Sequence, residues 1–182
     1  MLHTNYFKFH NVNIVKYDLL SKFNYKNIHQ IPSFNKIVLS IALKELNFKR
    51  MLQSTAALEL ISDQKVVLTN SKKANISLKL RKGAPVGCKV TLRKNLLFLF
   101  LSKLVSFIMP NIKVFEKIKF KDKKKNLNSF SFLFGDLLIF SELENQYDLF
   151  QKLPGLNISI ILFCNSTEEV STLLTSYRFP VN

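Results

Sequence analysis

Residues 64–93, QKVVLTNSKKANISLKLRKGAPVGCKVTLR, decide the predicted fold, because this stretch combines high positive charge with a regular pattern. It contains eight Lys or Arg residues and no acid. In two places apolar residues alternate with polar ones: Ile76, Leu78 and Leu80 with Ser77, Lys79 and Arg81, then Cys88, Val90 and Leu92 with Lys89, Thr91 and Arg93. This period of two predicts strands with one apolar and one basic face.

Turn-forming and small polar residues surround these two predicted strands. Gly83, Pro85 and Gly87 favour a turn between them, and residues 69–75 have the composition of an exposed loop. A sheet face and a loop that both carry cations fit a polyphosphate partner. The alternative is a solvated charged face that binds nothing.

Charge is segregated along the whole chain of 182 residues, whose net charge is +15. Residues 1–125 hold 25 Lys or Arg and six acids, whereas residues 126–182 hold two basic residues and six acids. A segregated basic footprint indicates a nucleic-acid binder, with an anionic membrane surface as the competing partner. The length predicts a single domain over residues 1–182.

The remaining patterns predict helices and strands in separate runs. Asn11 is the expected cap of a first helix that ends near Lys22 and buries Val15, Leu19 and Leu20. The other expected elements are a strand over residues 36–42, helices over 50–61 and 95–108, a hairpin of residues 129–134 and 137–140, a short helix over 146–152 and a strand over 157–163.

The last expected element is a helix that begins with a capping box at residues 166–169. Val170, Leu173, Leu174 and Tyr177 follow at helical spacing and should face the core. Together these patterns predict an α+β fold, with a mainly antiparallel sheet, helices packed on one face, and an open basic side. The lysine-rich residues 117–128 are expected to form a loop.

Several functional classes lack the residues that they need. Cys88 and Cys164 are too isolated for a zinc site and are expected to be core thiols, and His3, His10 and His29 have no cluster of metal-ligating partners. No phosphate-binding glycine loop or nucleophile elbow is present. We therefore expect no enzyme activity, catalytic residue, metal or cofactor. Residues 96–109 fall short of a membrane span and should form a buried helix, without stable membrane insertion.

Several phrases, in the same order, resemble the ribosomal L-five family, which binds 5S ribosomal RNA in the large subunit. They are YDLLSKFNYKNIHQIPSFNKIVLS from residue 17, LISDQK from 60, SKKANISLKLRKGAPVGCKVTLR from 71, LIFSEL from 138 and PGLNISIILFCNSTEEVSTLL from 154. The resemblance covers about residues 17–180. Residues 1–10 are then an N-terminal extension.

This resemblance implies a structural protein of the central protuberance that docks 5S rRNA and large-subunit rRNA on its sheet side and has neighbouring ribosomal proteins as partners. The implied rRNA-binding residues are Ser40, Gln64, Lys65, Lys89, Thr91 and Arg93. Ser40 is shorter than the Asn that the family usually has there. The basic loop of residues 71–83 is expected to reach the peptidyl-site tRNA, through Ser71, Lys72, Lys73, Asn75, Lys79, Arg81 and Lys82.

Two departures from the family suggest an organelle-encoded member. Residues 42–45 replace its glycine-rich turn, and the lysine-rich residues 121–128 replace a glycine-containing loop. The chain also has four Arg beside 23 Lys, and many Phe and Asn residues, which is typical of an A/T-rich genome. We expect the matrix of a mitochondrion, with a plastid or a bacterial cytoplasm as alternatives. The alternative functions are a membrane-surface accessory protein and an RNA-modifying enzyme.

Overall fold

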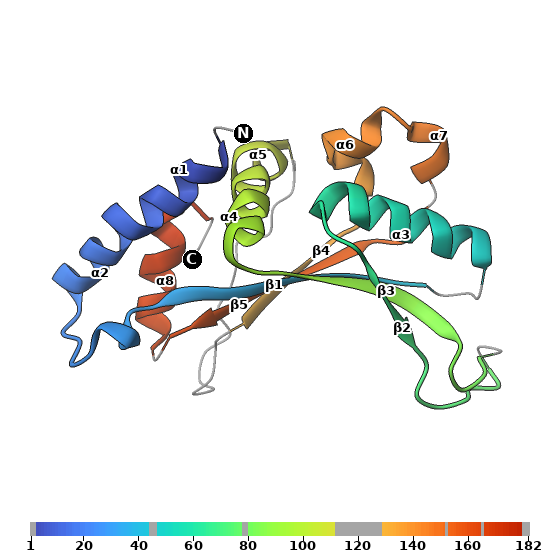
Figure 1. Ribbon diagram of the computed structural model, residues 1–182, viewed down its shortest axis with the longest axis horizontal. Helices are drawn as coiled ribbons and strands as arrows, with labels where there is room; N and C mark the ends of the chain where they lie inside the picture. Colours follow the sequence, from blue (N-terminus) through green and yellow to red (C-terminus); the bar gives the residue numbers. More distant parts are fainter. Residues whose placement is uncertain are drawn as a thin grey trace. The chain divides into compact units, whose positions relative to one another are not determined.

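The computed structural model describes residues 3–43, 47–77, 80–111, 129–151, 153–164 and 166–179 (Figure 1). The strands are β1 (Ser33–Ala42), β2 (Val67–Asn70), β3 (Pro85–Leu92), β4 (Ser129–Phe134) and β5 (Leu156–Phe163). The helices are α1 (His3–His10), η1 (Asn11–Val15), α2 (Lys16–Lys22), η2 (Ile28–Gln30), α3 (Phe48–Ser62), α4 (Lys94–Lys103), η3 (Leu104–Ile108), α5 (Met109–Asn111), η4 (Leu137–Ile139), α6 (Ser141–Glu144), α7 (Tyr147–Phe150) and α8 (Thr167–Ser176). The α+β class is confirmed.

One sheet joins the five strands in the order β2-β3-β1-β5-β4. β3 pairs antiparallel with both β1 and β2. β1 lies in the interior of the sheet, between β3 and β5. Ile37, Leu39 and Ile41 of this strand are buried, and they pair with Leu92, Val90 and Cys88 of β3.

Contacts divide the described residues into two compact units, and the strands β1, β4 and β5 pass from one to the other. The first unit comprises residues 1–36, 93–130 and 160–182, and the second comprises residues 37–92 and 131–159. In the second unit α3 packs on β3 and contacts α6 and α7. Ala57, Leu58 and Ile61 are the buried apolar residues of α3 that close this core.

The alternation in residues 88–93 is confirmed where it forms β3. Cys88, Val90 and Leu92 are almost fully buried, whereas Lys89 is exposed and Thr91 half-buried. The helix expected over residues 50–61 is also confirmed as α3, which Asn47 caps at its N-terminus by accepting a hydrogen bond from the Lys49 amide. Asp63 ends it in the left-handed conformation.

The prediction of a strand over residues 76–81 is wrong. Asn75 and Leu80 form an isolated bridge, and Ile76 is 94% exposed in the turn between them. Residues 78 and 79 lie outside the described part of the chain. The alternation was misleading because the segment reverses direction between the bridged residues, so the side chain of Ile76 reaches no core.

The expected start of the first helix is also wrong. Asn11 does not cap it, because α1, η1 and α2 follow one another without a break and Asn11 lies buried inside them. Val15 and Leu19 are buried as expected, but Leu20 is 43% exposed. Val15 and Leu19 are one helical turn apart and share the buried face, whereas Leu20 lies about 100° farther around the helix, toward solvent.

In the first unit, the apolar helix expected over residues 95–108 is confirmed as α4 and η3. Leu97, Phe100, Leu101 and Leu104 are buried. Among the described residues, no helix has the length and apolar character of a membrane span.

The C-terminal helix α8 matches its sequence signals closely. The Ser166 hydroxyl accepts a hydrogen bond from the Glu169 amide, and the Glu169 carboxylate accepts one from the Ser166 amide. Val170, Leu173, Leu174 and Tyr177 are buried. The prediction of a hairpin of residues 129–134 and 137–140 is wrong, because residues 137–139 form the 3₁₀ turn η4 rather than a strand. The lysine-rich residues 117–128 lie outside the described residues.

Candidate nucleic-acid interface

One face of the sheet in the second unit carries three of the expected RNA-binding residues. Ser40 pairs directly with Lys89, and Val38 pairs with Thr91. Paired residues point to the same side of a sheet, and side chains two apart along a strand do so as well. Ser40, Lys89 and Thr91 therefore share the face opposite to the buried Leu39, Val90 and their neighbours.

Neutral polar residues enlarge this face. Thr69 of β2 pairs with Gly87, and Asn157 and Ser159 alternate with buried residues of β5. The Ser131 and Ser159 hydroxyls lie 3.0 Å apart, which joins β4 to β5 by a hydrogen bond. We name the set of Ser40, Thr69, Lys89, Thr91, Ser131, Asn157 and Ser159 the polar sheet face.

The sequence analysis did not identify Thr69, Ser131, Asn157 or Ser159. Residues 157–163 were predicted as a strand, so the polar residues between its buried ones could have been found by the same alternation. Thr69 was assigned to a loop, whereas it lies in β2.

Gln64 and Lys65 are placed differently from the polar sheet face. Both are exposed in the connection between α3 and β2 and border a hollow of about 360 Å³ with Glu59 and Asp63. Glu59 accepts a hydrogen bond from the Val66 amide. The two acids make this place less favourable for phosphate than the sheet face.

Arg93 belongs to the first unit, where it is the exposed N-cap of α4, directly after β3.

Backbone hydrogen bonds hold the base of the basic loop of residues 71–83. The Ser71 amide donates to the Ala84 carbonyl at 2.8 Å, and the Gly83 amide donates to the Ser71 carbonyl at 2.9 Å. Farther along, Asn75 and Leu80 exchange two backbone bonds of 2.9 Å. Gly83 supplies the left-handed conformation that this turn requires, with φ of 86°. Lys72, Lys73, Asn75, Arg81 and Lys82 are exposed and Ser71 is half-buried, while Lys79 lies outside the described residues.

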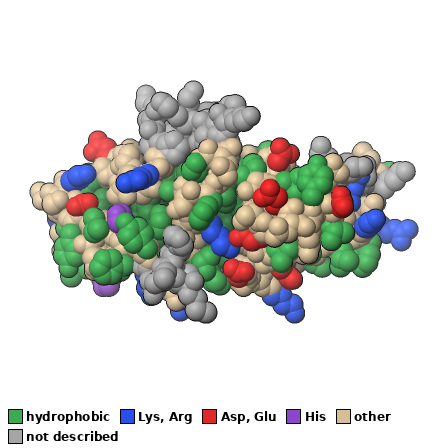
Figure 2. All heavy atoms as spheres, turned by 90° about the horizontal axis from the view of Figure 1, so that it is seen from above, with side chains coloured by type: hydrophobic (Ala, Val, Ile, Leu, Met, Phe, Trp, Pro, Cys, Tyr) green, Lys and Arg blue, Asp and Glu red, His purple; other side chains and the backbone are tan. Residues whose placement is uncertain are grey.

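Charge differs between the sheet and helix sides of the second unit. In the described part of the chain, Lys89 and the cations of the basic loop pair with no acidic side chain. Acids lie instead on its helices, at Glu59, Glu144 and Asp148, and Figure 2, seen from above Figure 1, shows acidic side chains gathered over these helices. An anionic partner is therefore attracted to the sheet side and the basic loop.

Neither cysteine has the environment of a reactive site. Burial raises the pKa of Cys88 to about 11, and its thiol faces the Ile41 carbonyl at 4.0 Å. Burial, followed by the nearby Glu169 charge, raises the pKa of Cys164 to about 11. Cys88 is a core thiol, as expected, whereas Cys164 is half-buried. No group of three or more metal-ligating side chains occurs among the described residues.

Comparison with known proteins assigns the family. The model of the C-terminus of the ribosomal L-five family matches residues 85–181. The large ribosomal subunit protein uL5m of Reclinomonas americana is 37% identical over 98% of both chains. The chain belongs to the ribosomal L-five family. The uL5 protein of Campylobacter hominis is 38% identical over 92% of both chains. The uL5 protein of Nitrosomonas eutropha is also 38% identical, over 94% of this chain and 95% of the relative.

Membership of the L-five family confirms several expectations. The chain is a structural, non-enzymatic component of the large ribosomal subunit, so the membrane-accessory and RNA-modifying alternatives are set aside. The similarity to the mitochondrial uL5m confirms the expected mitochondrial location, and the bacterial relatives fit its stated alternative.

Proposed function

We propose that the protein docks 5S rRNA, large-subunit rRNA, or both in the central protuberance through its polar sheet face, and contacts peptidyl-site tRNA with its basic loop. The observation that carries the rRNA part is the pairing of Ser40 with Lys89 and of Val38 with Thr91 on one uncovered face. Hydroxyl and ammonium groups at fixed spacing suit sugar and phosphate, which position RNA without reading its sequence.

The polar sheet face and the basic loop differ in rigidity. β3 is held on both sides by antiparallel pairing, so its side chains have fixed spacing. The loop extends beyond this ladder and carries exposed cations with no acidic partners among the described residues. We infer that the rigid polar sheet face binds rRNA and that the projecting basic loop contacts tRNA.

Isolation from the native source tests the rRNA assignment directly. The protein should co-purify at moderate salt with 5S rRNA or large-subunit rRNA. Purification without either RNA, from an extract with intact large subunits, would contradict the proposal.

Binding of the purified protein to these RNAs should weaken steeply with salt, because each neutralised phosphate releases counterion. The slope of log affinity against log salt should be about 0.7 to 0.9 per contact. Replacing Lys89 and Arg93 together by Ala should reduce it by roughly one to two units. The matched control, Lys22→Ala with Lys49→Ala, removes the same charge from helices. An equal change in the control would show that only net charge matters.

Thr91→Val should weaken rRNA binding without weakening the fold. In the described part of the chain the Thr91 hydroxyl has no partner, and valine keeps the β-branched shape. Loss of one hydrogen bond to RNA costs about 1 kcal/mol, roughly fivefold in affinity. Filter binding and thermal unfolding measure the two effects, with Thr55→Val on α3 as the control. If unfolding changes while affinity does not, Thr91 is a structural residue.

A further inference from the structure

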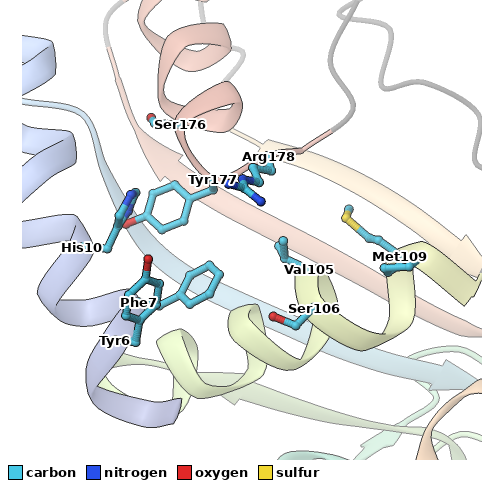
Figure 3. Close-up of a pocket in the computed structure, with 10 residues that line it drawn as sticks. Tyr6, Phe7, His10, Val105, Ser106, Met109, Ser176, Tyr177 and Arg178 are labelled. Atoms are coloured by element: carbon cyan, nitrogen blue, oxygen red, sulfur yellow. The ribbon is translucent and has the colours of Figure 1, made fainter. Parts of the chain in front are cut away.

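A cavity of about 740 Å³ lies within the first unit (Figure 3). Its walls come from α1, from η3 and α5, and from the end of α8, and they include Tyr6, Phe7, His10, Ser106, Tyr177 and Arg178. Cavities of roughly 300 to 1,000 Å³ are typical of sites for ligands the size of a nucleotide or drug. No Asp or Glu is among its described lining residues, and Arg178 supplies a positive charge.

Four aromatic rings form one side of this cavity. Phe7 stacks on Tyr177 with centroids 5.7 Å apart, and Tyr6 stacks on His10 at 6.1 Å. His10 meets Tyr177 edge to face at 5.6 Å. Figure 3 shows the Tyr177 ring between His10 and Arg178. Because Tyr6 is 61% exposed, an aromatic surface remains available for stacking at the cavity mouth.

The Tyr177 hydroxyl is an unsatisfied polar group. Tyr177 is only 2% exposed, and its hydroxyl has no hydrogen-bond partner among the described residues. Burial raises the pKa of Tyr177 above its ordinary value, so the hydroxyl keeps its proton and can donate. An unpaired buried hydroxyl lowers stability, and a polar ligand atom that reached it would satisfy it.

Arg178 occupies a backbone position that glycine would fill with less strain. It follows α8 in the left-handed conformation, with φ of 58°, while the Phe179 amide donates to the Leu174 carbonyl. Helices often end in this way, usually with glycine at the left-handed residue. The arginine side chain therefore lies at the cavity in a backbone conformation that costs free energy for any residue except glycine.

Among the described residues of the first unit there are two π-turns, and both lie next to this cavity. η1 begins directly after His10, and η3 contributes Val105 and Ser106 to the wall. Single π-turns within helices are frequent at functional sites because they displace side chains from the regular helical phase. The unpaired hydroxyl, the strained arginine and the two π-turns are separate features that converge on one place.

We propose that this cavity binds one unpaired nucleotide of ribosomal RNA, with its base stacked on the aromatic rings and its phosphate on Arg178. Stacking on aromatic side chains combined with a cation is the usual way in which proteins hold unpaired RNA bases. The inference rests on the proposed rRNA-binding function and adds a second contact, separate in its residues from the polar sheet face.

The test uses the full chain, with adenosine and uridine 5′-monophosphate as probes. Titration followed by NMR should move the His10 and Tyr177 ring signals. Arg178→Gly removes the charge and the strain, so nucleotide affinity should fall about fivefold or more while thermal stability is unchanged or higher. Tyr177→Phe should lower affinity about threefold to fivefold, again without loss of stability.

Lys94→Gly is the matched control, because Lys94 is also exposed, cationic and left-handed, with φ of 52°, but does not line the cavity. It should leave nucleotide affinity unchanged. Inorganic phosphate and adenosine, as separate probes, should each bind more weakly than the monophosphate if both ends of the site are used. Equal binding of phosphate alone would overturn the stacking part of the proposal.

Ultraviolet cross-linking in purified ribosomes is a second test of the cavity proposal. A nucleotide adduct on Tyr6 or Phe7 supports the proposal, whereas a neighbouring protein cross-linked there overturns it. If the protein binds rRNA with the expected salt dependence but no mononucleotide perturbs His10 or Tyr177, the cavity proposal fails and the proposed function stands. If a mononucleotide binds at the cavity but the protein binds no rRNA, the proposed function is overturned, and the assignment of the cavity to an rRNA nucleotide is overturned with it.

Discussion

Gly87→Ala is expected to destabilise the second unit by about 3 kcal/mol, lowering the unfolding temperature by roughly 10 °C. A Cβ at this position would lie 2.5 Å from the Ile41 carbonyl oxygen and 3.2 Å from the Thr69 hydroxyl. The carbonyl belongs to the paired strand β1 and cannot move without disturbing the ladder. Calorimetry or circular dichroism during heating measures the loss.

The same substitution should also weaken rRNA binding, because Gly87 lies two residues before Lys89 in the ladder that spaces the polar sheet face. Gly135→Ala is the control, since no heavy atom lies within 4 Å of a Cβ placed there. It should change stability by less than about 1 kcal/mol. A Gly87→Ala protein as stable as the Gly135→Ala protein would mean that β1 and β3 are not held in the pairing described.

Replacing Lys72 and Lys73 together by Ala should weaken binding of peptidyl-site tRNA by roughly tenfold or more, since one charged hydrogen bond contributes about 1.5 kcal/mol. Both side chains are exposed and neither has an acidic partner among the described residues. The backbone bonds at the base of the loop do not involve these side chains, so the fold should be retained. tRNA affinity is measured on purified ribosomes that carry the double variant.

The amount of variant protein in the large subunit is measured in the same experiment and should stay normal. Lys22→Ala with Lys26→Ala removes an equal charge from another exposed segment and should leave tRNA affinity unchanged. The opposite pattern, poor assembly with normal tRNA binding by the particles that form, would make the basic loop an rRNA anchor.

Local sequence signals predicted those elements whose side-chain pattern agrees with their final environment. The capping box at Ser166 and the helical spacing from Val170 to Tyr177 are satisfied within one turn or along one helix face, so no distant residue had to be known. Residues 88–92 alternate because one face of β3 packs on the core and the other is open. The family resemblance added the ribosomal role, which comparison with known proteins confirmed.

The sequence did not predict those features of the fold and the site that depend on contacts between residues far apart in the chain. Residues 76–81 show the same alternation as β3, yet they form no regular strand, and Ile76 is exposed. Periodicity records which residues could share a face, but only tertiary packing decides whether a core covers that face. The sequence alone thus determined the α+β class, the basic region and the capped C-terminal helix. Only the tertiary structure decided the pairing of Ser40 with Lys89 and the convergence of Phe7, His10 and Tyr177 on one cavity, because these contacts join segments that no local pattern relates.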